Sequence, residues 1–139
     1  MSARILVLED NAYLATALSR LLKRMGYDVM HANCCASALA IDAHFDLGVF
    51  DLELPDGGGI EVSSELIGSG NLGAVVFFTA TLDGALYKRA ERMAPCIQKT
   101  DGIDVLLDAI RCELQTAPAR AVGGGNGGKV LRWRGRRGR

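Results

Sequence analysis

The segment LGVFDLELPDGGG, residues 47–59, decides how the rest of the chain is interpreted. Its first four residues have the length and apolar character of a buried strand, and they lead directly to the carboxylate of Asp51. A proline, which favours turns, follows shortly afterwards, and three glycines give the backbone the freedom to turn sharply. A carboxylate that ends a buried strand beside a tight turn makes Asp51 the first candidate site residue.

Strand-like and helix-like segments alternate along the chain. Five apolar runs of strand length occur at residues 4–8, 27–32, 47–50, 73–78 and 95–98. Most of these runs are continuously apolar, which is typical of strands buried on both faces of a parallel sheet. Helix-compatible segments follow the runs at residues 12–25, 35–44, 59–68, 83–93 and 102–115. This alternation predicts an α/β fold, a three-layer sandwich with right-handed crossovers.

The composition excludes several classes of protein. The 139 residues are 49% hydrophobic and 23% charged, as in an ordinary globular domain. No apolar run reaches the roughly 18–20 residues that span a bilayer, and the N-terminus lacks a signal-peptide pattern, so we expect a cytoplasmic protein without membrane insertion. The four cysteines form no CxxC pair and are expected to be reduced structural thiols. His31 and His44 are expected on the solvent side.

The formal net charge of zero conceals an asymmetry along the chain. Residues 123–139 contain six of the sixteen Lys and Arg residues and none of the sixteen acidic residues, so an acidic body precedes a basic tail. We expect a domain at residues 1–116, a Gly-rich linker at 117–128 and a disordered tail at 129–139. Nucleic-acid contact through the tail arginines and Trp133 is an alternative to a solvated terminus.

Polar side chains collect at the ends of the predicted strands. Glu9 and Asp10 follow the first strand, Asp51 the third, Thr79 the fourth and Lys99 the fifth. Parallel strands end at the same edge of a sheet, where ligands of open α/β folds bind. Neighbouring carboxylates resist joint ionisation unless a cation intervenes, and Mg²⁺ prefers such oxygen ligands. The pattern therefore indicates phosphoryl transfer with Asp51 as nucleophile, although Asp10 has the alternative role of a helix cap.

Four short motifs in this order resemble the receiver (CheY-like) domain of two-component response regulators. They are VLEDN at 7–11, VFDLELPDGGG at 49–59, FFTA at 77–80 and IQKT at 97–100. The resemblance covers about residues 3–116. It implies a flavodoxin-like (βα)5 sandwich whose five-stranded parallel sheet has the order 2-1-3-4-5.

The resemblance also assigns roles to the strand-end residues. It implies that Asp51 is the phosphoacceptor and that Asp10, Asp51 and the backbone carbonyl of Glu53 bind Mg²⁺. Glu9 is expected to act on the metal mostly through water. Thr79 and Lys99 are expected to hold phosphate oxygens. Gly59 corresponds to the glycine that opens the third helix of such domains.

Two positions depart from the family pattern. Cys96 stands three residues before the lysine, where similar receivers carry Tyr or Phe, and Thr100 stands where they carry a cis proline. Because a non-proline cis bond costs about 3–4 kcal/mol, we expect the Lys99–Thr100 bond to be trans. Both changes lie where the family transmits its signal.

The functional hypothesis is a single-domain response regulator, phosphorylated on Asp51 by a histidine kinase or a histidine phosphotransfer protein in a Mg²⁺-dependent reaction. Such a protein is a signalling phosphoacceptor rather than an enzyme, with only self-catalysed phosphotransfer and dephosphorylation, and is a monomer or a phosphorylation-dependent dimer. The alternative, which Cys96 and Thr100 leave open, is a phosphorylation-independent docking module.

Two further segments resemble enzyme motifs, but each lacks a residue that the motif requires. Residues 123–130, GGGNGGKV, follow the P-loop pattern except that Val130 stands where Ser or Thr binds Mg²⁺. The segment DLEL, residues 51–54, is similar to the DxD motif of aspartyl-phosphate phosphatases, but Glu53 replaces the acid–base aspartate. We therefore favour neither a nucleotide site nor a phosphatase.

Overall fold

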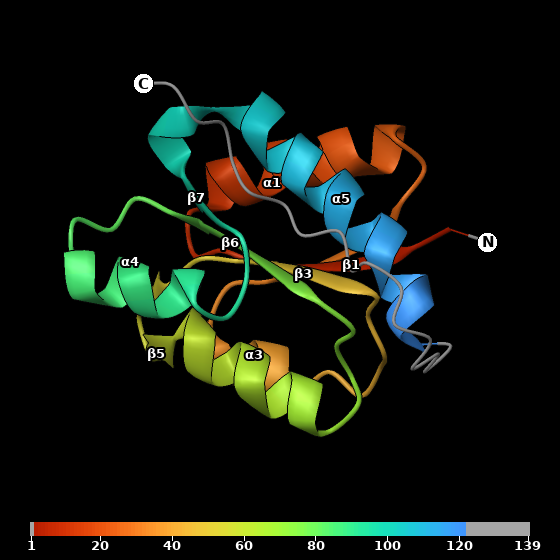
Figure 1. Cartoon of the computed structure of the whole chain (residues 1–139), viewed down its shortest axis with the longest axis horizontal. Coiled ribbons are helices and arrows are strands. Elements are labelled where there is room, and N and C mark those ends of the chain that lie inside the picture. The colour runs from red at the N-terminus through yellow and green to blue at the C-terminus, as the bar shows by residue number, and fades with distance from the viewer. Residues whose placement is uncertain (1, 122–139) are drawn as a thin grey trace.

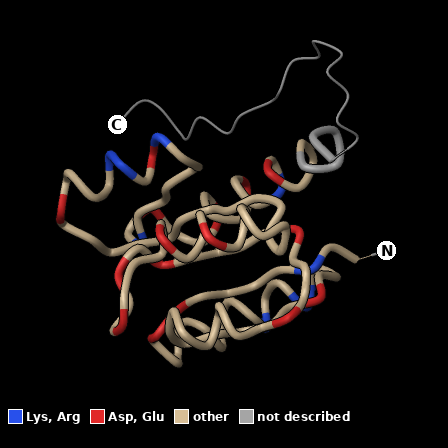
Figure 2. The backbone as a smooth tube through the Cα atoms, turned by 90° about the horizontal axis from the view of Figure 1, so that it is seen from below, with Lys and Arg blue, Asp and Glu red and all other residues tan. Residues whose placement is uncertain are grey.

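A computed structural model of the chain describes residues 2–121. The predicted basic tail and the P-loop-like segment lie outside these residues, as does most of the predicted linker. Figure 2 shows acidic and basic residues interspersed along the described part of the chain. None of its helices is long and apolar enough to cross a membrane.

Five parallel strands form the central sheet. They are β1 (Arg4–Leu8), β2 (Asp28–Ala32), β3 (Leu47–Phe50), β6 (Val75–Thr79) and β7 (Cys96–Gln98). Their order in the sheet is β2-β1-β3-β6-β7, which confirms the expected order 2-1-3-4-5 once the strands of this sheet are counted along the chain. All four pairings are parallel, so every strand ends at the same edge.

Helices cover both faces of the sheet, as the three-layer prediction requires. They are α1 (Ala12–Arg24), α2 (Cys35–Leu39), α3 (Gly59–Gly68), α4 (Gly84–Glu91) and α5 (Ile103–Ala121). Figure 1 shows α1 and α5 on one face of the sheet and α3 and α4 on the other.

Strand β1 shows why its apolar residues run without interruption. Ile5 and Val7 belong to the core cluster that includes residues of α1 and α5. Leu6 and Leu8 belong to the cluster that includes residues of α2, α3 and α4. All four side chains have no exposed surface, so both faces of the strand are buried.

Two helix boundaries differ from the sequence prediction. Helix α2 ends at Leu39 rather than near residue 44, because Phe45 pairs with Leu72 and Asp46 accepts a hydrogen bond from the Arg4 backbone, which draws the chain back to the sheet. Helix α5 continues through Ala121 rather than ending at residue 115, although this last stretch contains Pro118, which has no backbone N–H to donate within the helix. The domain boundary at residue 116 stays a prediction.

A small hairpin that the sequence analysis did not predict follows β3. It pairs β4 (Glu53–Leu54) with β5 (Gly57–Gly58) in antiparallel fashion. In its turn, Asp56 accepts hydrogen bonds from the backbone N–H groups of Cys35, at 2.8 Å, and Ala36, at 3.0 Å. These bonds cap the N-terminus of α2 and attach the loop after Asp51 to the neighbouring helix.

Candidate functional site

Three carboxylates meet at the edge where the strands end. Glu9 and Asp10 follow β1 and Asp51 follows β3, and one carboxylate oxygen from each lies within 4.8 Å of the others. Glu9 is only 3% exposed and Asp51 8%, whereas Asp10 is exposed to solvent. The three acidic residues of the predicted Mg²⁺ site, of which Glu9 was expected to act mostly through water, are therefore close enough together to serve one metal ion. The cap of α1 is provided by Asn11, whose side chain accepts from Tyr13 and Leu14.

Lys99 places a cation beside the two buried carboxylates. Its Nζ lies 2.9 Å from Glu9 Oε1 and 3.1 Å from Asp51 Oδ2. Lys99 opens the short 3-10 helix η1 (Lys99–Asp101) directly after β7, and its side chain is 22% exposed. The ammonium group thus compensates part of the negative charge of the cluster.

Burial and the short distance between Glu9 and Lys99 shift the pKa values of both side chains. Burial raises the pKa of the Glu9 carboxyl, and the hydrogen bond with Lys99 offsets only part of that effect. For Lys99, burial acts against the charged form, but the hydrogen bond with Glu9 and the negative charge of Asp51 outweigh it, and its pKa is raised. The ammonium is therefore held in its charged form at the site.

Asp51 is fixed through both of its oxygens. Oδ2 contacts Lys99, while Oδ1 accepts a hydrogen bond from the backbone N–H of Leu52 at 2.7 Å and a longer one from that of Glu53 at 3.5 Å. Glu53, whose backbone carbonyl is expected to serve the metal, is exposed to solvent.

Thr79 ends β6 at the same edge and is fully buried. Its hydroxyl oxygen accepts a hydrogen bond from the backbone N–H of Thr81 at 3.0 Å. A hydroxyl can accept and donate at the same time, so Thr79 keeps the capacity to donate to a ligand oxygen. The residues predicted from the strand ends, Glu9, Asp10, Asp51, Thr79 and Lys99, therefore all follow or end strands at one edge.

The sequence matches the response regulator receiver domain over residues 5–111. The chain belongs to this family. This confirms the resemblance that the four motifs indicated.

Solved structures share the fold of this receiver. A CheY-like response regulator receiver domain protein from Methanospirillum hungatei is 22% identical with a TM-score of 0.77, covering 86% of this chain and 99% of that chain. The BeF3-activated receiver domain of RstA from Klebsiella pneumoniae is 25% identical with a TM-score of 0.70, covering 81% of this chain and 98% of that chain. The response regulator TrrA from Thermotoga maritima, in complex with Mg²⁺-BeF, is 24% identical with a TM-score of 0.70, covering 81% and 99%. No curated protein matches the chain.

Position 59 must be a glycine because its backbone lies very close to the backbone of Asp51. A Cβ atom at this position would lie 1.9 Å from the backbone oxygen of Asp51, which no side chain can accommodate without a backbone shift. The turn glycines beside Asp51 thus bring the start of α3 against the end of β3.

The two departures from the family pattern have clear structural settings. Cys96 is 6% exposed and belongs to the core cluster on the α2, α3 and α4 side of the sheet. Burial, with the charge of Glu91 adding to it, raises the pKa of the Cys96 thiol to about 12, so the thiol is neutral. None of the described residues has a cis peptide bond, which confirms the expected trans bond between Lys99 and Thr100.

Sequence reasoning missed two polar contacts near the site. His31 is exposed as expected, but its Nε2 lies 2.8 Å from the backbone oxygen of Glu9. The hydroxyl of Tyr87 on α4 donates to the backbone oxygen of Cys96 at 2.7 Å. The position of His31 near the end of a strand next to β1 was a signal for the first contact. The sequence holds no signal for the second, because it depends on the placement of α4.

Proposed function

We propose that this receiver accepts a phosphoryl group on Asp51 from a histidine kinase or a histidine phosphotransfer protein, and acts in cytoplasmic two-component signal transduction. The observation that carries the proposal is the arrangement of Lys99, whose ammonium contacts both Glu9 and Asp51. A partly buried cation beside a carboxylate nucleophile provides the charge compensation that phosphoryl transfer requires.

The donor set supports Mg²⁺ as the metal. Carboxylates of Asp10 and Asp51, with the backbone carbonyl of Glu53, would hold the ion directly, and Glu9 would act mostly through water. These are hard oxygen donors, and the carboxylate oxygens lie close enough together to serve one ion. When bound, Mg²⁺ would offset the negative charge that develops on the phosphoryl oxygens.

The chemistry follows from the groups at the edge. A carboxylate oxygen of Asp51 would attack the phosphorus of a phosphohistidine, so that an O–P bond forms while the N–P bond breaks. The imidazole nitrogen leaves with the electron pair of the broken bond. Lys99 and the hydroxyl of Thr79 would donate to the phosphoryl oxygens, and the backbone N–H of Leu52 keeps Asp51 oriented.

Intact-mass measurement tests the proposal. We expect a gain of one phosphoryl group after incubation with Mg²⁺ and acetyl phosphate, and no gain for Asp51→Asn or without Mg²⁺. Asp46→Asn is a suitable control, since Asp46 lies at the opposite end of β3. Phosphorylation of Asp51→Asn to the wild-type level would contradict the assignment of the phosphoacceptor.

The second candidate function is a docking module that works in any phosphorylation state. The small buried side chain of Cys96, at the position that is aromatic in similar receivers, favours it. Absence of phosphorylation by acetyl phosphate and by a panel of histidine kinases would support this alternative over the first.

A further inference from the structure

Lys99 reaches the site from a short turn between strand β7 and helix α5. The strand ends at Gln98, the 3-10 helix η1 occupies only Lys99–Asp101, and α5 begins at Ile103. A 3-10 helix of three residues has few backbone hydrogen bonds of its own, and their geometry is poorer than in an α-helix. The direction in which the Lys99 side chain leaves the backbone therefore depends on the groups that hold this turn.

The carboxylate of Asp101 closes the turn around Lys99. Its Oδ2 accepts a hydrogen bond from the backbone N–H of Gln98 at 3.3 Å. The backbone N–H of Gly102 donates to the carbonyl of Lys99 at 3.4 Å, and Gly102 has a φ of +97°, in the left-handed region that favours glycine. The residues on the two sides of Lys99 are thus joined through the side chain of Asp101.

Gln98, the residue that Asp101 binds, is itself fixed to the sheet. It lies opposite Thr79 in the parallel pairing of β7 with β6. Its side-chain Nε2 donates to the backbone oxygen of the buried Thr81 at 3.4 Å. The hydrogen bond between Asp101 and Gln98 therefore ties the far side of the turn to a well-anchored part of the protein.

The ammonium of Lys99 has to be placed accurately, because it lies close to two carboxylates at once. Its Nζ is 2.9 Å from Glu9 Oε1 and 3.1 Å from Asp51 Oδ2. A lysine ammonium has three N–H donors, so these two contacts leave the capacity to donate once more, to a phosphoryl oxygen. The lysine side chain is long and flexible, and a small rotation of its backbone would move the ammonium away from one or both carboxylates.

We propose that Asp101 is the residue that positions the ammonium of Lys99 at the two buried carboxylates. It acts through the backbone, by accepting the hydrogen bond from the Gln98 N–H. The consequence for phosphoryl transfer rests on the proposed function, in which Lys99 donates to the phosphoryl group. Asp101 itself touches no reacting atom, so its loss would slow the reaction without abolishing it.

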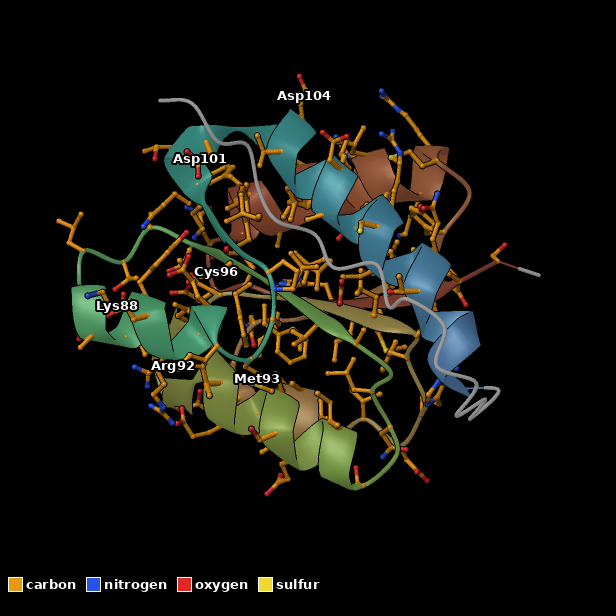
Figure 3. The ribbon with its side chains drawn as sticks, viewed as in Figure 1. Lys88, Arg92, Met93, Cys96, Asp101 and Asp104 are labelled. Carbon is orange, nitrogen blue, oxygen red and sulfur yellow. The ribbon has the colours of Figure 1, made fainter. Side chains whose placement is uncertain are left out.

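Asp104 is the matched comparison for Asp101, because it is the next acidic residue along the chain. It is exposed and lies in the first turn of α5. Figure 3 shows Asp104 pointing away from the protein, whereas Asp101 lies on the turn that leads into the helix. Removal of the Asp104 carboxylate should therefore leave the turn around Lys99 intact.

The reactivity of Lys99 tests the inference without any phosphoryl transfer. N-hydroxysuccinimidyl acetate acetylates lysine amines, and peptide mass spectrometry measures the rate at each lysine. The Lys99 side chain is mostly buried and is held by two carboxylates, so its acetylation should be slow. In Asp101→Ala we expect Lys99 to be acetylated about 2- to 10-fold faster than in the wild type, the range that corresponds to the loss of one hydrogen bond. The exposed Lys23 and Lys88 should keep their rates and serve as references in the same molecule.

Two further variants separate positioning from charge and from general stability. Asp101→Asn removes the charge but keeps an oxygen that can accept from the Gln98 N–H, so Lys99 should react as in the wild type. Ile110→Val removes part of a fully buried side chain on α5 and lowers stability without touching the turn, so it should not change the rate at Lys99 either. A rate in Asp101→Asn or Ile110→Val equal to that in Asp101→Ala would overturn the inference. So would a wild-type rate in Asp101→Ala.

The rate of phosphorylation by acetyl phosphate in the presence of Mg²⁺, followed by intact mass, measures the consequence for the reaction. We expect Asp101→Ala to be phosphorylated about 2- to 10-fold more slowly than the wild type, and Asp104→Ala at the wild-type rate. In Lys99→Met, the addition of Asp101→Ala should cause no further slowing, because the side chain that Asp101 positions is gone. An equal slowing in both backgrounds would mean that Asp101 acts independently of Lys99, and this result overturns the inference.

The two measurements distinguish this inference from the proposed function. A wild type that gains no phosphoryl group from acetyl phosphate or from a kinase overturns the proposed function. The acetylation rate of Lys99 in Asp101→Ala then still decides whether Asp101 positions the ammonium. A phosphorylated wild type whose Lys99 is acetylated at the same rate as in Asp101→Ala overturns the inference alone.

Discussion

Lys99 Nζ lies 3.1 Å from Asp51 Oδ2, although the two residues are 48 positions apart in the chain. They meet because β3 and β7, which lie on either side of β6, are parallel and end at the same edge of the sheet. The same ammonium also contacts Glu9, which follows β1. The chemistry of the site is therefore assembled by the topology of the sheet and not by any local sequence motif.

Replacement of Lys99 by methionine should destabilise the protein at pH 7 without Mg²⁺. The change leaves the buried carboxylate of Glu9 beside Asp51 with no cation, and we expect a loss of about 1–3 kcal/mol in the free energy of unfolding. Urea unfolding of Lys99→Met and of the exposed control Lys23→Met measures it. Mg²⁺ should reduce the difference in the free energy of unfolding between Lys99→Met and wild type, because the ion compensates the same carboxylate charges as Lys99. Equal stability of Lys99→Met and wild type would contradict this interpretation.

Gly59→Ala should be among the most disruptive single substitutions near the site. Its Cβ would lie 1.9 Å from the backbone oxygen of Asp51, so the backbone must shift, and we expect a loss of about 3 kcal/mol. Gly68→Ala, at the last residue of α3, is the matched control because its Cβ would meet nothing within 4 Å. That substitution should stabilise the protein by up to about 1 kcal/mol through helix propensity. Thermal unfolding distinguishes the two cases.

The sheet and the site residues could be predicted because they depend on strong and simple constraints. Strands such as β1 and β3 are buried on both faces, so their residues are continuously apolar, and parallel pairing brings their ends together. A polar residue directly after such a strand, like Asp51, is then placed at the edge without further information. The Lys99–Thr100 bond was predictable for the same kind of reason, since the energy of a cis bond decides it.

The features that escaped prediction depend on the placement of loops and of short helices. Helix α2 ends early because residues from two separate segments, at Arg4 and at Leu72, bind the chain after it. The contacts of Asp56 with Cys35 and of Tyr87 with Cys96 join segments whose separation is set only by tertiary packing. Neither contact leaves a periodic or compositional pattern in the sequence.

The cap formed by Asp56 should make the stability of the protein depend on acid pH. The backbone N–H groups of Ala36 and Cys35 lower the pKa of the Asp56 carboxyl. In the unfolded protein the pKa of Asp56 is near 3.8, and in the folded protein it is lower. The cap therefore stabilises the fold fully when the pH is above 3.8. This stabilisation is lost as the pH falls through the pKa that Asp56 has in the folded protein. Asp56→Ala should therefore be less stable than wild type at pH 7, and the difference should shrink below about pH 3.8.

Urea midpoints at pH 7 and pH 3 measure the effect of Asp56→Ala. Asp42→Ala is the control, because Asp42 is an exposed carboxylate of the same region. It should have little effect at either pH. A difference for Asp56→Ala that is the same at both pH values would show that the carboxylate does not act as a charged cap.

Mg²⁺ should stabilise the folded protein through the three carboxylates at the sheet edge. Binding to the folded state alone raises the free energy of unfolding by about 1.4 kcal/mol when the free Mg²⁺ concentration is ten times its dissociation constant. A titration of the melting temperature with MgCl₂ should therefore show a saturable rise. Asp10→Asn should remove most of this rise, because Asp10 contributes one of the clustered carboxylates. Asp104→Asn, an exposed acid on α5, should leave it unchanged. A rise of equal size in Asp10→Asn would mean that Mg²⁺ acts elsewhere on the surface, since the carboxylate of Asp10 is a direct ligand in the proposed site.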